Sequence, residues 1–154
     1  MDTTADSLWD KELELGNDLI DTQHRMLYLL AHKLDIAIKS KETQHTIQRV
    51  VLEVKKFIEF HFVSEENLML EIGYPELDKH MVIHSDLLRE LDAALIQINK
   101  HSTQPADLLT YLGKWLHAHV LHDDLKIAEH LEYSKRRPIG ENLYEEYLMH
   151  DKSE

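Results

Sequence analysis

The sequence predicts an all-α protein: an antiparallel up-down four-helix bundle with an N-terminal extension and a short C-terminal helix. Apolar residues recur in long stretches at alternating steps of four and three, the spacing that keeps them on one face of a helix. The 154-residue chain contains only 4 glycines and 3 prolines, and most of them fall between the periodic stretches. Strand-like alternation of apolar and polar residues is absent from the sequence. A chain of this length is enough for one domain with a sizeable core.

The expected helices span, in order, residues 18–38, 42–72, 76–100 and 105–132. Asn17 or Asp18 is the expected cap of the first helix, because both side chains accept from free backbone N–H groups. Gly73 ends the second helix, and Pro105 suits the first turn of the fourth, where its missing N–H costs nothing. The extension is then residues 1–17, the bundle residues 18–132, and the C-terminal tail, with its short helix, residues 133–154.

Charge and composition exclude several functions. Lysine and arginine number 17 against 29 aspartates and glutamates, a net charge of −12 with histidine neutral, which repels nucleic-acid phosphates and anionic lipid. The chain has no cysteine, which excludes disulfides, thiolate nucleophiles and sulfur-based metal sites. No apolar run approaches the roughly 20 residues of a membrane span, and no secretory signal begins the sequence. We therefore expect a cytoplasmic protein that binds neither nucleic acid nor membrane.

Five positions on the inward stripes of the first three helices are polar instead of apolar. They are His24, His61, Glu65, His80 and His84. Burying an unpaired carboxylate or imidazole is unfavourable, so the chain must gain something from them. Residues four apart on a helix point the same way, which pairs His61 with Glu65 and His80 with His84. Imidazole nitrogen with carboxylate oxygen suits iron, zinc, manganese or copper(II), and the stripes therefore predict a metal site instead of a merely polar core.

The fourth helix does not settle its own ligands. Its rhythm runs to His119 and resumes at Asp124, a step of five residues where four is expected. Ideal helical spacing would pair His119 with Asp123, or His117 with Asp124. A single π-type turn would instead bring both His119 and Asp124 inward, and such turns are frequent at functional sites. Spacing leaves these alternatives open.

Several sequence motifs together resemble those of the hemerythrins, and among them the single-domain bacteriohemerythrins. The matching pieces are Ile20-Asp21-Thr22-Gln23-His24, His61-Phe62-x-x-Glu65-Glu66-x-x-Met69, Gly73-Tyr74-Pro75, His80-x-x-x-His84 and Trp115-Leu116-x-x-His119-Val120-x-x-x-Asp124. The resemblance runs from about Trp9 to Leu131. No single piece is specific, but the combined spacing is.

The resemblance implies a non-haem di-iron centre, and it selects His119 and Asp124 in the fourth helix. The implied ligands are His80, His84 and His119 for one iron, His24 and His61 for the other, and Glu65 and Asp124 as bridges beside a hydroxide or oxide. The implied function is reversible binding of dioxygen, without catalysis. By family position, an oxygen pocket would be lined by Leu27, Trp115, Leu116 and Val120.

Two other di-metal or metal chemistries fit the sequence poorly. A ferritin-like di-iron oxidase needs two Glu-x-x-His motifs inside the bundle, and the chain has one such spacing, at Glu42 and His45, off the stripe. A zinc hydrolase usually carries His-Glu-x-x-His, and the His80 to His84 segment lacks the glutamate. The closer alternative is an oxygen or redox sensor that uses the same centre to signal to a partner. Few residues follow the match, so we expect a stand-alone carrier, store or delivery protein; the sequence does not identify an oxidase or signalling partner.

Overall fold

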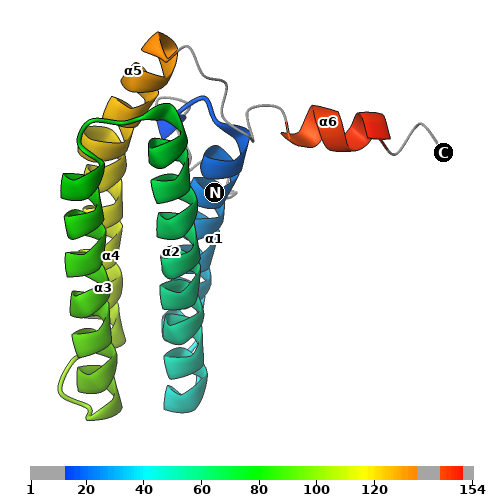
Figure 1. Cartoon of the computed structure of the whole chain (residues 1–154). Helices are drawn as coiled ribbons and strands as arrows, with labels where there is room; N and C mark the ends of the chain where they lie inside the picture. Colours follow the sequence, from blue (N-terminus) through cyan, green and yellow to red (C-terminus); the bar gives the residue numbers. More distant parts are fainter. Residues whose placement is uncertain (1–12, 135–142, 151–154) are drawn as a thin grey trace.

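The structure, a computed structural model, describes residues 13–134 and 143–150, and every element in these ranges is helical (Figure 1). The helices are α1 (Asp18–Lys39), α2 (Gln44–Ile72), α3 (Leu77–Asn99), α4 (Pro105–His119), the π-helical turn η3 (Val120–Asp124), α5 (Leu125–Tyr133) and α6 (Leu143–His150). Together α4, η3 and α5 form one continuous rod, the predicted fourth helix. The all-α prediction is confirmed. Trp9 and most of the expected N-terminal extension lie outside the described residues.

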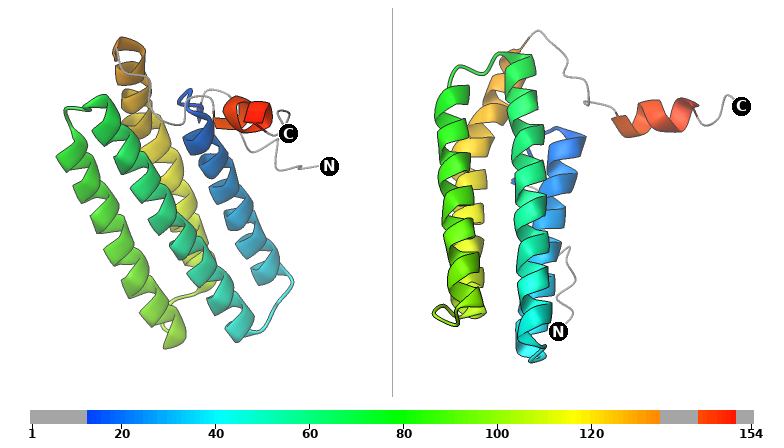
Figure 2. Two further views of the ribbon diagram at one scale, coloured as in Figure 1. Left: turned by 45° about the vertical axis from the view of Figure 1, so that its right-hand side comes forward. Right: turned by 60° about the horizontal axis from the view of Figure 1, so that its bottom comes forward.

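The four long helices pack side by side with antiparallel neighbours. Helix α1 contacts α2 and α4, and α2 contacts α3. Figures 1 and 2 show α4 lying beside α3, which closes the ring of four. The short helix α6 contacts α1 and extends away from the bundle. No helix of the described residues is both long and apolar enough to span a lipid bilayer.

The helix ends follow from the residues found there. The Asn17 side chain accepts a hydrogen bond from the Ile20 backbone N–H at 3.2 Å, which identifies Asn17 as the cap of α1. Gly73 ends α2 with φ +66°, a left-handed conformation that a residue with a Cβ adopts only under strain. Pro105 occupies the first turn of α4, as predicted. These ends turn each helix back against its predecessor.

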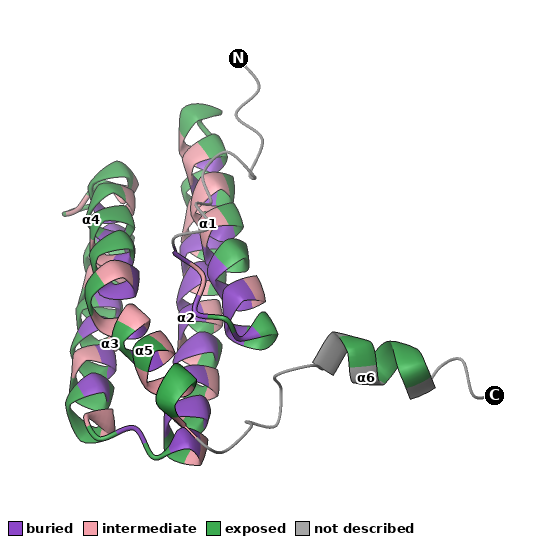
Figure 3. Ribbon diagram, turned by 90° about the horizontal axis from the view of Figure 1, so that it is seen from above, coloured by how far each residue is buried: buried purple, intermediate pink, exposed green. Residues whose placement is uncertain are grey.

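Two apolar clusters fill the interior, one above the other along the bundle. On α1, Leu27 belongs to the larger cluster and Ile20 to the smaller one, with the buried His24 between them. The same order recurs on α2, where Glu65 lies between Phe62 and Leu68. Figure 3 shows the buried residues on the inward faces of the helices. The predicted ligands therefore form a polar layer enclosed by apolar side chains on both sides.

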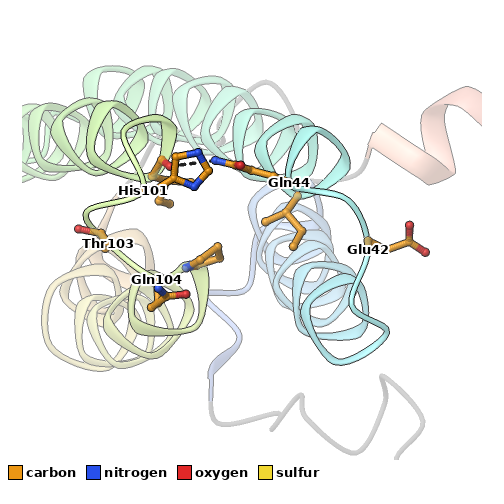
Figure 4. Close-up of a pocket in the computed structure, with 8 residues that line it drawn as sticks. Glu42, Gln44, His101, Thr103 and Gln104 are labelled. Atoms are coloured by element: carbon orange, nitrogen blue, oxygen red, sulfur yellow. Dashed lines mark hydrogen bonds between the residues drawn. The ribbon is translucent and has the colours of Figure 1, made fainter.

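A pocket of about 240 Å³ lies between the α1–α2 loop and the α3–α4 loop (Figure 4). Glu42, Gln44, His101 and Gln104 are among its lining residues, and Gln44 donates a hydrogen bond to the Ile98 carbonyl there. These loops are at the opposite end of the bundle from the polar layer. The pocket is lined by none of the predicted ligands.

Candidate metal centre

The structure brings all seven predicted ligand residues together in the polar layer. Each is at most 4% exposed, and they come from all four helices: His24, His61, Glu65, His80, His84, His119 and Asp124. Among the described residues, they form two overlapping groups that can hold a metal ion, with ligand atoms within 4.8 Å of one another. One group is Glu65, His80, His84 and His119, and the other is His24, His61, Glu65 and Asp124.

The π-helical turn explains the step of five residues in the fourth helix. In η3 the backbone is widened by one residue, so Asp123 and Asp124 both reach His119. The Nε2 of His119 lies 3.0 Å from an Asp124 oxygen, and its Nδ1 lies 3.1 Å from an Asp123 oxygen. The π-type alternative is thus confirmed. The pairing of His119 with Asp123 also occurs, on the outer side of the ring, whereas His117 is exposed and pairs with neither.

The two oxygens of Glu65 face different histidine groups. Its Oε2 lies 3.2 Å from Nε2 of His80 and 3.1 Å from Nε2 of His84. Its Oε1 lies 3.7 Å from Nε2 of both His24 and His61. The single carboxylate of Glu65 therefore faces both histidine groups at once.

Asp124 repeats this arrangement from the opposite side. Its Oδ1 lies 3.2 Å from Nε2 of His80 and 3.0 Å from Nε2 of His119, while its Oδ2 lies 3.3 Å from Nε2 of His24. The three-histidine group and the two-histidine group thus share two carboxylates. A pair of metal ions bridged by acids requires this placement of oxygens.

The outer nitrogens of two histidines indicate where their protons lie. The Nδ1 of His84 is 2.8 Å from a Glu66 oxygen, and the Nδ1 of His119 is 3.1 Å from Asp123. A carboxylate can only accept, so each ring donates its Nδ1–H and turns the Nε2 lone pair inward. These two Nε2 atoms are 3.2 Å apart. Two lone pairs at that distance repel unless positive charge lies between them, and a metal ion supplies it.

The carboxylate oxygens give a second test of fit. Oε1 of Glu65 and both oxygens of Asp124 are inaccessible to solvent and have no hydrogen-bond donor among the described residues. Their short contacts to imidazole nitrogens lack the geometry of a hydrogen bond. Buried carboxylates without donors are strongly unfavourable, and buried charges of this kind are paired or bind metals. The residues present, all nitrogen and oxygen donors, therefore fit bound metal ions, iron among them.

The electrostatics of the layer also favour a cation at its centre. Burial opposes protonation of His24 and His80, but the carboxylates of Asp124 and Glu65 outweigh it and raise the pKa of each imidazole to about 9. Burial lowers the pKa of His61 to about 4, so this ring is neutral. Burial alone would raise the pKa of Glu65, yet the surrounding imidazoles hold it well below its ordinary range. Protons on imidazoles thus replace the charge that metal ions would provide.

Aromatic rings cover the three-histidine group. Phe62 stacks on His84 with ring centroids 3.6 Å apart and planes within 1°, and Trp115 stacks on His119 at 4.5 Å and 20°. The other residues predicted for an oxygen pocket, Leu27, Leu116 and Val120, are buried and belong to the same apolar cluster as Phe62, against which Trp115 packs. The surroundings of the layer are apolar, which disfavours water.

Three further residues hold the ligands: sequence reasoning assigned no role to Gln23 or Glu66, and it considered Asp123 only as an alternative partner of His119. The outer nitrogens of His84, His119 and His61 contact Glu66, Asp123 and Gln23, respectively. Each of these partners is the immediate sequence neighbour of a predicted ligand. A hydrogen-bonding side chain directly beside an inward histidine or acid is the signal that could have found them.

This fold and site define a class: helix-bundle proteins that hold a metal centre between their helices on histidines and carboxylates. Residues 15–131 match the family described as the hemerythrin HHE cation binding domain. Because the match covers most of the chain, the protein belongs to the hemerythrin family. Family membership and the histidine–carboxylate cluster support a protein that binds metal, iron in particular, and oxygen.

Individual relatives agree with this assignment. The chain is 29% identical over 122 residues to a bacteriohemerythrin of Clostridium acetobutylicum, covering 76% of this chain and 95% of that protein. It is 29% identical over 125 residues to a bacteriohemerythrin of Stenotrophomonas maltophilia, covering 81% of each. A crystal structure of wild-type hemerythrin has a TM-score of 0.71 at 22% identity and covers 85% of this chain and 97% of that chain. That structural likeness shows the shared fold.

Proposed function

We propose that the protein binds dioxygen reversibly at a non-haem di-iron centre and acts as an oxygen carrier, store or delivery protein. The observation that supports it best is the pair of shared carboxylates, because Glu65 and Asp124 each direct one oxygen to each histidine group. In this proposal both acids would bridge the irons, together with a hydroxide or oxide. When bound, the ferrous pair supplies electrons that dioxygen withdraws and returns.

The unequal histidine groups determine where dioxygen would bind. One iron would have three histidines, His80, His84 and His119, and the other would have two, His24 and His61. With both acids shared, the second iron would have one protein ligand fewer and hence an open position. The residues predicted for the oxygen pocket, Leu27, Trp115, Leu116 and Val120, would supply the apolar surroundings of the centre, with Trp115 on the side of His119. Excluding water there favours release of dioxygen over irreversible oxidation of the irons.

A sensor of oxygen or redox state is the second candidate. It would use the same centre and pass its state to a partner protein. One observation favours it: α6 exposes Tyr147, Leu148 and Met149, an apolar surface that a partner could cover. Oxygen-dependent association with a partner would separate this role from that of a carrier.

Anaerobic loading with ferrous iron tests the proposal. We expect two irons per chain, a visible colour on exposure to air, and loss of that colour when dioxygen is removed under argon. His61→Ala removes a ligand and is expected to lose metal. The matched control is His45→Ala on the same helix, because His45 is exposed and outside the centre. Reduced, iron-loaded protein that stays colourless in air and takes up no gas would contradict the proposal.

A further inference from the structure

A chain of hydrogen bonds leads from the backbone to the outer nitrogen of His61. The Ser64 hydroxyl donates to the Phe60 carbonyl at 3.2 Å, and Nε2 of Gln23 donates to the Ser64 oxygen at 3.0 Å. Oε1 of Gln23 then lies 2.9 Å from Nδ1 of His61. Gln23 is 4% exposed, and its contact with His61 is buried, whereas the Ser64–Phe60 end of the series lies at the surface of α2.

The donors of these hydrogen bonds all point the same way, from His61 through Gln23 and Ser64 to the Phe60 carbonyl. A carbonyl only accepts, so the Ser64 proton is committed to Phe60 and the Ser64 oxygen must accept from the Gln23 amide. The Gln23 amide therefore presents its carbonyl oxygen to His61, whose Nδ1–H must donate. The lone pair of His61 is left on Nε2, which faces Glu65. The backbone of α2 thus fixes the tautomer that a metal ligand needs.

The other histidine group is held by charged acceptors. His84 and His119 donate to the carboxylates of Glu66 and Asp123, whose side chains are 22% and 29% exposed. A carboxylate acceptor makes an imidazole a more basic ligand and so favours the higher oxidation state of its metal. A neutral amide acceptor increases the basicity of the imidazole less than a carboxylate does. The two metal sites are therefore supported by acceptors of different charge.

We propose that Gln23, oriented by Ser64, is a positioning residue that fixes His61 in its metal-binding tautomer and keeps the iron of the two-histidine group the more easily reduced of the pair. The inference rests on the proposed function, because it concerns the iron at which dioxygen would bind. A neutral acceptor at this position helps that iron to remain ferrous between cycles. The carboxylates Glu66 and Asp123 would lower the reduction potential of the other iron.

Metal binding to the metal-free protein tests the positioning role. Gln23→Leu removes the acceptor, and we expect cobalt(II) affinity to fall by about 10–100-fold, measured anaerobically from the visible spectrum. Gln23→Glu restores an acceptor and is expected to restore the affinity. The matched control is Gln48→Leu, which makes the same change on α2 far from the centre. Unchanged cobalt affinity in Gln23→Leu would overturn the positioning role.

The redox role has its own readout. Gln23→Glu replaces only an amide by a carboxylate, and we expect the midpoint potential of the iron-loaded protein to fall by at least ~59 mV, the one-electron equivalent of a tenfold change. An unchanged or higher potential would overturn this part. Nitrogen-15 spectra of the metal-free protein should show the Nδ1–H tautomer of His61, and Ser64→Ala should reduce it. Dominance of the Nε2–H tautomer in the unaltered protein would refute the positioning role of Gln23 even if Gln23→Leu failed to fold.

Failure of the inference and failure of the proposed function give different results. If the unaltered protein binds two cobalt ions with the expected tautomer but its iron form takes up no dioxygen, the proposed function is wrong. The positioning role of Gln23 is then still supported. If dioxygen binds reversibly and the Gln23 variants match the unaltered protein in cobalt affinity and midpoint potential, the positioning role of Gln23 is wrong. The proposed function is then still supported.

Discussion

Glu65 has no access to solvent, and its two oxygens face imidazole nitrogens of different histidine groups: Oε2 lies 3.2 Å from Nε2 of His80, and Oε1 has no hydrogen-bond partner of ordinary geometry. A carboxylate in such a place is stable only while positive charge surrounds it. Neutralising this residue leaves the volume of the site unchanged and removes the charge that two metal ions would share. Glu65 is therefore the residue whose substitution separates packing from metal binding.

We expect Glu65→Gln to lower metal affinity by at least ~100-fold, about 2.8 kcal/mol, because an amide oxygen is a weaker bridge and brings N–H donors into the layer. Metal analysis after dialysis at a fixed free metal concentration measures it. The control is Glu53→Gln on the same helix, whose exposed carboxylate pairs with Lys33 at 2.6 Å. Full metal content in the Glu65 variant would show that this carboxylate is not a ligand.

The five ligands of the first three helices could be predicted from the sequence because each one interrupts an apolar stripe, whereas spacing alone left His119 and Asp124 undecided. His24 lies between Ile20 and Leu27 on α1, where an apolar residue would otherwise cost less. Gln23 could not be assigned in this way, because it lies on the flank of the stripe, where polar residues are ordinary. Only the contact between α1 and α2 brings its amide to the His61 ring.

At the scale of the element, the π-helical turn decides which acid enters the centre. In a regular α-helix a residue five positions on points about 140° away from the first. The slip in the apolar rhythm after His119 predicts that something accommodates an extra residue, but several local solutions fit the same spacing. In the structure η3 places Asp124 inward and Asp123 beside the outer nitrogen of His119.

Replacing glycine by alanine is expected to have opposite effects on stability at the end of a helix and inside one, which gives a paired prediction. Gly73 has φ +66° at the end of α2, so Gly73→Ala is expected to lower the free energy of unfolding by about 1 kcal/mol. Gly113 lies within α4, and an added Cβ there would meet no atom within 4 Å. Gly113→Ala is expected to raise the same quantity by about 0.5–1 kcal/mol. Urea unfolding of both variants measures it, and shifts of the same sign would contradict the assignment.

At the scale of the whole molecule, the bundle and the centre are specified by different parts of the pattern. The apolar stripes and the residues between them predict four antiparallel helices, because those stripes can be buried only against one another. The polar layer contributes little to that burial, because apolar residues on both sides of it supply most of the buried surface. On α1, Ile20 lies on one side of the layer and Leu27, Leu30 and Leu34 lie on the other. The place of α6 could not be predicted, because eight residues carry too short a pattern to define what they pack against.

The buried polar layer predicts opposite effects of pH on two quantities: the stability of the metal-free protein and its affinity for metal. Without metal, the carboxylates raise the pKa of His24 and His80 from 6.5 to about 9. A raised pKa contributes stability that is fully present below pH 6.5 and is lost as the pH rises through 9. The metal-free protein should therefore lose stability on the order of a few kcal/mol across this range. Metal binding requires unprotonated imidazoles, so metal affinity should rise over the same range.

Urea unfolding at pH 6.5 and pH 9, with chelator and with saturating cobalt(II), checks both signs in one experiment. The control is His45→Gln, which removes an exposed histidine of α2 and should leave both responses unchanged. The gap in stability between the loaded and metal-free protein should widen with pH, because bound metal replaces the protons that the buried acids otherwise hold on His24 and His80. A metal-free protein as stable at pH 9 as at pH 6.5 would mean that Glu65 and Asp124 do not depend on the imidazoles for their charge, and the layer would then need no metal.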